Sequence, residues 1–149
     1  MLATSFYDGI KWIHIMAVVI GFGGAFLYPI WFAALQNYQS EQRAFFHRVQ
    51  ARIGKFVISP ALLVLVLTGA YMASDRDYWD EPWVSVPLLI AILLGAMGGV
   101  YFGPREERLA DLQTGPEYQA LLRQMRSVTY VSLALVAIAA YFMVAKPFA

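Results

Sequence analysis

Four long apolar stretches dominate the sequence, at about 10–35, 56–73, 84–102 and 127–145. Each is close to or longer than the ~18 residues that a helix needs to cross the hydrocarbon of a bilayer. The sequence therefore predicts an all-α fold, a four-transmembrane-helix bundle that forms a single integral membrane domain over residues 1–149.

Polar and helix-breaking residues mark the ends of these helices. Gly103-Pro104 is predicted to end the third helix, and Thr114-Gly115-Pro116 is predicted to form a turn. Leu121, Leu122 and Met125 then follow at helical spacing, so the fourth helix is expected to begin before its apolar stretch. Pro60 is expected to kink the second helix, because proline cannot donate a backbone hydrogen bond.

The basic residues predict how the helices are oriented. Segments 36–55 and 103–126 carry most of the lysines and arginines, and positive charge favours the cytoplasmic side. Both termini and segment 74–83 are thus expected on the extracytoplasmic side of a bacterial inner membrane. The basic residues predicted on the cytoplasmic side are Arg43, Arg48, Arg52, Lys55, Arg105, Arg108, Arg123 and Arg126. Those predicted on the extracytoplasmic side are Lys11, Arg76 and Lys146.

Composition agrees with a lipid environment and excludes several kinds of chemistry. Apolar residues make up 60% of the chain and charged residues only 14%, which indicates that the lipid bilayer is the main partner. A net charge of +1, without a long basic tract, argues against binding to nucleic acid. The absence of cysteine removes disulfides, thiolate metal sites and iron–sulfur clusters.

Small residues predict where helices pack together. Ala91, Gly95, Gly99 and Gly103 recur every four residues in the third helix, a pattern typical of close helix contact in membranes. We expect another helix of the same chain to pack on this ridge. The alternative is that the ridge packs against a second copy of the chain or another subunit of a membrane complex.

The first helix has a comparable face that also carries a histidine. His14 shares one stripe with Gly21 and Ala25, so this face is predicted to point into the bundle. Two interpretations of His14 stay open: a ligand to haem iron or a metal, and a histidine that is hydrogen-bonded across helices. His47, beside Arg43, Arg48 and Arg52, is expected in a solvated basic patch at the inner surface.

Second ligands for a site at His14 would have to lie at the outer level, where Met72 and Met143 are expected. His with Met suits haem iron, and His with thioethers suits Cu(I). No Ser/His/Asp arrangement, HExxH motif or phosphate-binding glycine loop occurs, so no catalytic residues are assigned and the sequence leaves open whether the protein is an enzyme.

Several short motifs resemble a known group of proteins: Lys11-Trp12-Ile13-His14-Ile15, Ile58-Ser59-Pro60-Ala61, Thr68-Gly69 and the terminal Lys146-Pro147-Phe148. The chain resembles an uncharacterised family of small bacterial four-helix integral membrane proteins, distantly similar to HemJ-type protoporphyrinogen oxidases and CopD-type copper-resistance proteins. The resemblance implies that His14 binds haem b. Pro87 stands where HemJ-type proteins have an essential lysine, so the resemblance implies haem binding without protoporphyrinogen oxidation.

Three functional hypotheses follow. The first is a small membrane protein that binds haem b or a related porphyrin through His14. The second is a non-catalytic accessory subunit that docks through the ridge of Gly95, Gly99 and Gly103. The third is a protein that handles copper at the outer face through His14, Met72 and Met143.

Overall fold

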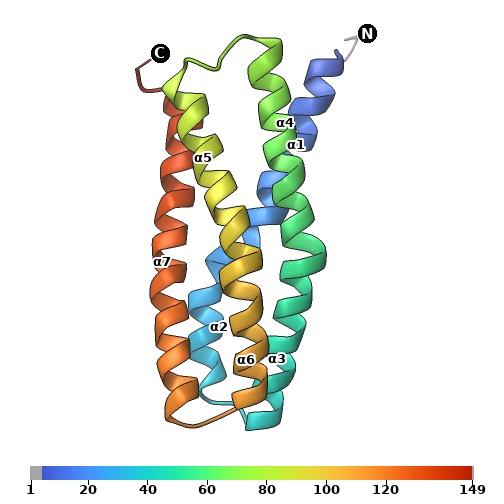
Figure 1. Cartoon of the computed structure of the whole chain (residues 1–149). Coiled ribbons are helices and arrows are strands. Elements are labelled where there is room, and N and C mark those ends of the chain that lie inside the picture. The colour runs from blue at the N-terminus through green and yellow to red at the C-terminus, as the bar shows by residue number, and fades with distance from the viewer. Residues whose placement is uncertain (1–4, 149) are drawn as a thin grey trace.

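The computed structural model describes residues 5–148 and places them in four long helical rods (Figure 1). Three of the rods consist of two α-helices joined by a short segment of altered helix, and the fourth is one continuous helix. In chain order these are α1 (Phe6–Gly23), η1 (Gly24–Leu27) and α2 (Tyr28–Leu35); α3 (Ser40–Ile53), η2 (Gly54–Ile58) and α4 (Ser59–Asp75); α5 (Pro82–Met97), η3 (Gly98–Phe102) and α6 (Gly103–Leu112); and α7 (Pro116–Ala145).

The rods confirm the predicted all-α fold with four helices that are long and apolar enough to span a membrane. They are longer than the apolar stretches, because α3 occupies most of segment 36–55, while α6 and the start of α7 occupy most of segment 103–126. The predicted helix end at Gly103-Pro104 is wrong. A proline is tolerated in the first turn of a helix, and Pro104 takes such a position in α6. The early start of the fourth helix is confirmed at Pro116.

The termini lie at the same end of the bundle, together with the connection between α4 and α5 (Figure 1). We call this the terminal end, and the end with connections 36–39 and 113–115 the opposite end. Along the terminal half, α1 packs on α4, α4 on α5, and α5 on α7; in the opposite half, α3 packs on α6 and α2 on α7. The side of the membrane that each end faces stays a prediction from the basic residues.

Each of the three interrupted rods changes its helical geometry just before a proline. η1 is a tightened turn before Pro29, whereas η2 and η3 are widened π-turns before Pro60 and Pro104. The proline ring clashes with the carbonyl four residues earlier and leaves it without a donor. In η2 and η3 the backbone widens, and the N–H of the residue before each proline donates to the carbonyl five residues earlier.

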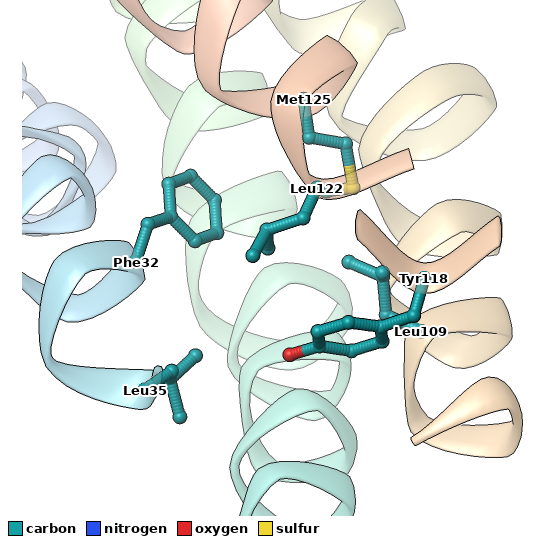
Figure 2. Close-up of a cluster of buried hydrophobic side chains, with 6 residues drawn as sticks. All are labelled: Phe32, Leu35, Leu109, Tyr118, Leu122 and Met125. Carbon is teal, nitrogen blue, oxygen red and sulfur yellow. The ribbon is translucent and has the colours of Figure 1, made fainter. Parts of the chain in front are cut away.

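The larger of the two clusters of buried hydrophobic side chains in the described residues lies at the opposite end. A core cluster of six fully or almost fully buried side chains fills the space between α2, α6 and α7 (Figure 2). Its members are Phe32, Leu35, Leu109, Tyr118, Leu122 and Met125. Figure 2 shows the Tyr118 ring reaching from α7 into this cluster, with the hydroxyl at its far end.

The small residues predicted to form helix seams fall into two groups. At Gly21, an added Cβ would lie 2.9 Å from Leu62 Cδ2, so α1 and α4 approach closely there, and at Gly95 it would lie 3.8 Å from Leu62 Cβ. Within residues 5–148, an added Cβ at Gly99 would meet nothing within 4 Å, and one at Gly103 would meet only the Gly98 carbonyl of its own rod. A side chain added at Gly99 or Gly103 would therefore not meet a neighbouring rod at its Cβ position.

Candidate functional site

A cavity of about 400 Å³ lies between the rods at the level of the three helix interruptions. Ala25, Gly54 and Gly99 bring the interrupted segments to its wall, and the uninterrupted α7 contributes Thr129, Ser132 and Val136. An added Cβ at Gly54, Gly98 or Gly99 would meet nothing within 4 Å among residues 5–148, and these glycines border the cavity.

A buried hydrogen-bonded network of three side chains adjoins this cavity. His47 of α3 has its Nδ1 2.6 Å from Glu106 Oε2 of α6 and its Nε2 2.9 Å from the Tyr118 hydroxyl of α7. His47 is 0% exposed, and Glu106 and Tyr118 are each 1% exposed. The network therefore joins three rods without contact with solvent, and each ring nitrogen of His47 has one partner.

The surrounding elements hold this network in place. The His47 ring meets the rings of Phe46 and Tyr118 edge to face. Arg43, one turn before His47, donates to the carbonyls of Leu35, Gln36 and Tyr38 and so caps the end of α2. Its guanidinium also lies 5.8 Å from the centre of the Tyr118 ring.

Two buried oxygens at the cavity have no hydrogen-bond partner within residues 5–148. They are Glu106 Oε1, the carboxylate oxygen that His47 does not use, and Thr129 Oγ1. Both residues line the cavity, and Thr129 is 4% exposed. A buried polar atom without a partner costs about 1–3 kcal/mol, so such atoms call for an explanation.

The structure contradicts the expectation that His47 lies in a solvated basic patch. Residues 40–53 form a helix, and its buried face carries Ala44 and His47, while Arg48 and Arg52 are exposed on the other face. The apolar pattern of the sequence predicts no helix between residues 35 and 56 and so does not predict this network. The spacing of Ala44, His47 and Ala51 by three and four could have revealed the buried face.

His14 lies in the seam between α1 and α4, in the terminal half. Its Nδ1 is 2.9 Å from Thr68 Oγ1, and the Thr68 hydroxyl is directed at the carbonyls of Val64, at 2.7 Å, and Leu65, at 3.1 Å. Because the hydroxyl has only one hydrogen, His14 donates its Nδ1–H to Thr68, and Nε2 keeps its lone pair. A Cβ at Gly69 would lie 3.2 Å from His14 Cε1, so the ring packs closely on the α4 backbone.

The methionines predicted to assist His14 lie on two different rods. Met72 is on α4, one turn beyond Thr68, whereas Met143 is on α7. Figure 1 shows α7 and α1 on opposite sides of the bundle at the terminal end, where α1 packs on α4. In the part of the chain that the structure describes, no group of three or more His, Asp or Glu residues is placed to hold a metal ion.

Comparison with known proteins identifies the family. Residues 8–147 match the model of the family described as Predicted integral membrane protein (DUF2269). No curated protein and no solved structure matches the chain, so the resemblance to HemJ-type and CopD-type proteins gains no support from them. Because the matched residues span nearly the whole chain and the four rods are long and apolar enough to cross a bilayer, the protein belongs to the DUF2269 family of multi-pass integral membrane proteins.

Proposed function

We propose that this protein binds a small, mostly apolar molecule with one polar group in the cavity between its interrupted helices. The observation that carries the proposal is that Glu106 and Thr129, which line a cavity of about 400 Å³, each have a buried oxygen without a hydrogen-bond partner within residues 5–148, Oε1 and Oγ1 respectively. A hydroxyl or amine of the bound molecule would donate to these oxygens. Its apolar body would lie against Leu62, Leu94 and Val136.

The size and lining of the cavity support this function. Sites for small molecules commonly measure about 300–1,000 Å³ and combine an apolar wall with a few polar groups that fix orientation. The backbone gives independent support. Irregular backbone at membrane depth is tolerated where it lines a cavity, and interrupted helices surround binding sites in many transporters.

Photolabelling with a hexanol that carries a diazirine tests the proposal on the full chain in lipid nanodiscs. We expect labelling of the cavity wall at Leu94 and Val136, and we expect excess unlabelled hexanol to prevent it. Ser132→Phe, which places a ring in the cavity, should abolish this labelling. Glu117→Gln, on the exposed surface of α7, should leave it unchanged.

Label that accumulates on the exposed residues Val131 and Val144, without competition by hexanol, would contradict the proposal. Such a pattern would mean that the probe partitions into lipid and that the cavity takes none of it.

Haem b or copper at His14 is the second candidate function, favoured by the orientation of the imidazole. A histidine that ligates a metal generally donates its other ring N–H to a neighbouring group, as His14 does to Thr68. Nε2 of His14 would then be the ligand atom, with Met72 as the nearest thioether along α4. An absorption spectrum after loading with haem tests haem binding, and metal analysis after loading with copper tests copper binding. A haem absorption band or a bound copper content that is unchanged in His14→Ala would contradict this function.

An assembly through the glycine ridge is a separate proposal for the partner. Gly99 is exposed, and no side chain within residues 5–148 covers it. Gly99→Leu should disrupt an oligomer or complex that packs on this ridge, which native mass spectrometry would detect. An unchanged mass would count against this role.

A further inference from the structure

The His47 network can change its protonation state without losing a hydrogen bond. When His47 is neutral, its Nδ1–H donates to Glu106 Oε2 and the Tyr118 hydroxyl donates to Nε2. When His47 carries a second proton, Nε2–H donates to the Tyr118 oxygen, because a tyrosine hydroxyl can donate or accept. The same three side chains therefore satisfy either state with the same partners.

The electrical charge of the network differs between these states. With His47 protonated and Glu106 ionised the pair is neutral, whereas with His47 neutral and Glu106 ionised it carries one negative charge. An apolar, buried environment penalises the uncompensated charge. A positive charge in the cavity, beside Glu106 Oε1, would compensate it.

Other charged and titratable groups around the cavity do not supply that positive charge to Glu106. Lys55 and Glu107 line the cavity but are exposed, and they carry opposite charges. The Arg43 guanidinium donates to three carbonyls at and just beyond the end of α2, and it lies 5.8 Å from the centre of the Tyr118 ring. Arg105 lies 3.7 Å from the centre of the Tyr101 ring and donates to the Tyr101 carbonyl, while Tyr28 adds a phenol to the cavity wall.

We propose that the molecule bound in the cavity is a small organic cation, an ammonium on an apolar chain, that exchanges with one proton of the His47–Glu106 pair. This inference rests on the proposed binding function and names the class of ligand. The juxtaposition that carries it lies in one carboxylate: Glu106 lines the cavity, its buried Oε1 has no hydrogen-bond partner within residues 5–148, and its Oε2 is bound to His47.

Charge and protons balance in this exchange. The ammonium N–H groups donate to Glu106 Oε1 and Thr129 Oγ1, and the second proton of His47 leaves to water. The Tyr118 hydroxyl then turns to donate to Nε2. One positive charge enters the site and one leaves, so the buried region keeps the same net charge with and without the ligand.

Isothermal titration calorimetry of the full chain in nanodiscs tests the exchange with two probes, hexylammonium and hexanol. Titrations in buffers that differ in ionisation enthalpy count the protons exchanged per bound ligand. We expect release of about one proton per bound hexylammonium and none per bound hexanol. Empty nanodiscs supply the blank for partition into lipid.

A matched pair of variants locates the effect. Glu106→Gln keeps the shape of the side chain but not its charge, so it should weaken hexylammonium binding by on the order of tenfold or more and abolish proton release. The exposed Glu117→Gln should change neither quantity. The proton count in the unmodified protein needs no variant, so the test stays decisive if Glu106→Gln does not fold.

Three outcomes would overturn part of this account. Hexylammonium that binds without releasing a proton, or hexanol that binds where hexylammonium does not, would overturn the exchange and leave the binding function standing. If neither probe binds, the binding function itself fails, and the exchange with it.

Discussion

Burial of a histidine beside a glutamate has a free-energy cost that shapes the rest of the molecule. Removing a charged pair from water costs several kcal/mol per ion, and only good geometry and further hydrogen bonds offset it. Here the 2.6 Å contact between His47 Nδ1 and Glu106 Oε2 and the 2.9 Å contact with Tyr118 supply those bonds. One oxygen of Glu106 is still left without a partner in the described region, which is why we place the function there.

A double-mutant cycle measures the coupling within the pair. His47→Leu leaves the Glu106 carboxylate buried and unpaired, so we expect the free energy of unfolding to fall by about 3 kcal/mol or more. Combining it with Glu106→Leu should restore much of that loss, because two apolar side chains replace the pair. Unfolding in mixed micelles, followed by circular dichroism, provides the free energies.

The exposed pair of Arg108 and Glu117 is the matched control. Both side chains are more than half exposed, so their removal should cost less than about 1 kcal/mol. If the single variants at His47 and Glu106 cost no more than those at Arg108 and Glu117, the network is not buried as described.

The two histidines show what sequence reasoning reached at the scale of single residues. The stripe of His14 and Gly21 correctly indicated a face toward another helix, because spacing within one continuous apolar helix is readable. His47 was misplaced because neighbouring arginines suggested solvent. The partner Glu106 is 59 residues away, and a contact over such a separation is set by packing that one sequence does not display.

At the scale of elements, the interruptions before Pro29, Pro60 and Pro104 all border the cavity. The sequence predicted the kink at Pro60, yet it did not predict that two rods would widen into π-turns and continue. A proline is compatible with both outcomes, and the choice depends on whether a neighbouring rod covers the freed backbone. η2 and η3 lie against each other, which provides that cover.

Close packing of α1 on α4 can be tested at Gly21. Gly21→Leu should push the rods apart, because even a Cβ would lie 2.9 Å from Leu62 Cδ2, and we expect a loss of about 2 kcal/mol or more in the free energy of unfolding. Gly9→Leu is the control on the same helix, since nothing lies within 4 Å of its Cβ position. It should be neutral or slightly stabilising, as leucine favours helix over glycine. Equal effects at the two glycines would exclude a tight seam at Gly21.

At the scale of the whole molecule, the number of spans and the lipid-facing exterior were predictable from the sequence. Long apolar segments have few alternatives in a bilayer, where every backbone group must be bonded internally. The lengths of the rods were not predictable from hydropathy, because α3 and α6 continue as polar helices beyond the apolar segments.

The orientation of the bundle is open to a direct test, because the chain has no cysteine of its own. Single cysteines introduced as Asp77→Cys at the terminal end and Thr114→Cys at the opposite end should react differently with a membrane-impermeant maleimide. The distribution of lysine and arginine predicts that intact spheroplasts label residue 77, and that residue 114 labels only after permeabilisation. The reverse pattern would invert the orientation without changing the fold.

The buried network at the cavity is the central claim, and ¹⁵N NMR of the His47 imidazole tests it most directly. The sequence contains two histidines, so His14→Gln leaves His47 as the only source of the signal. A ring held between Glu106 and Tyr118 should show two distinct, hydrogen-bonded nitrogens in a fixed arrangement, and Glu106→Gln should shift Nδ1. Two tautomers in rapid exchange, unaffected by Glu106→Gln, would show a solvated histidine and contradict the account.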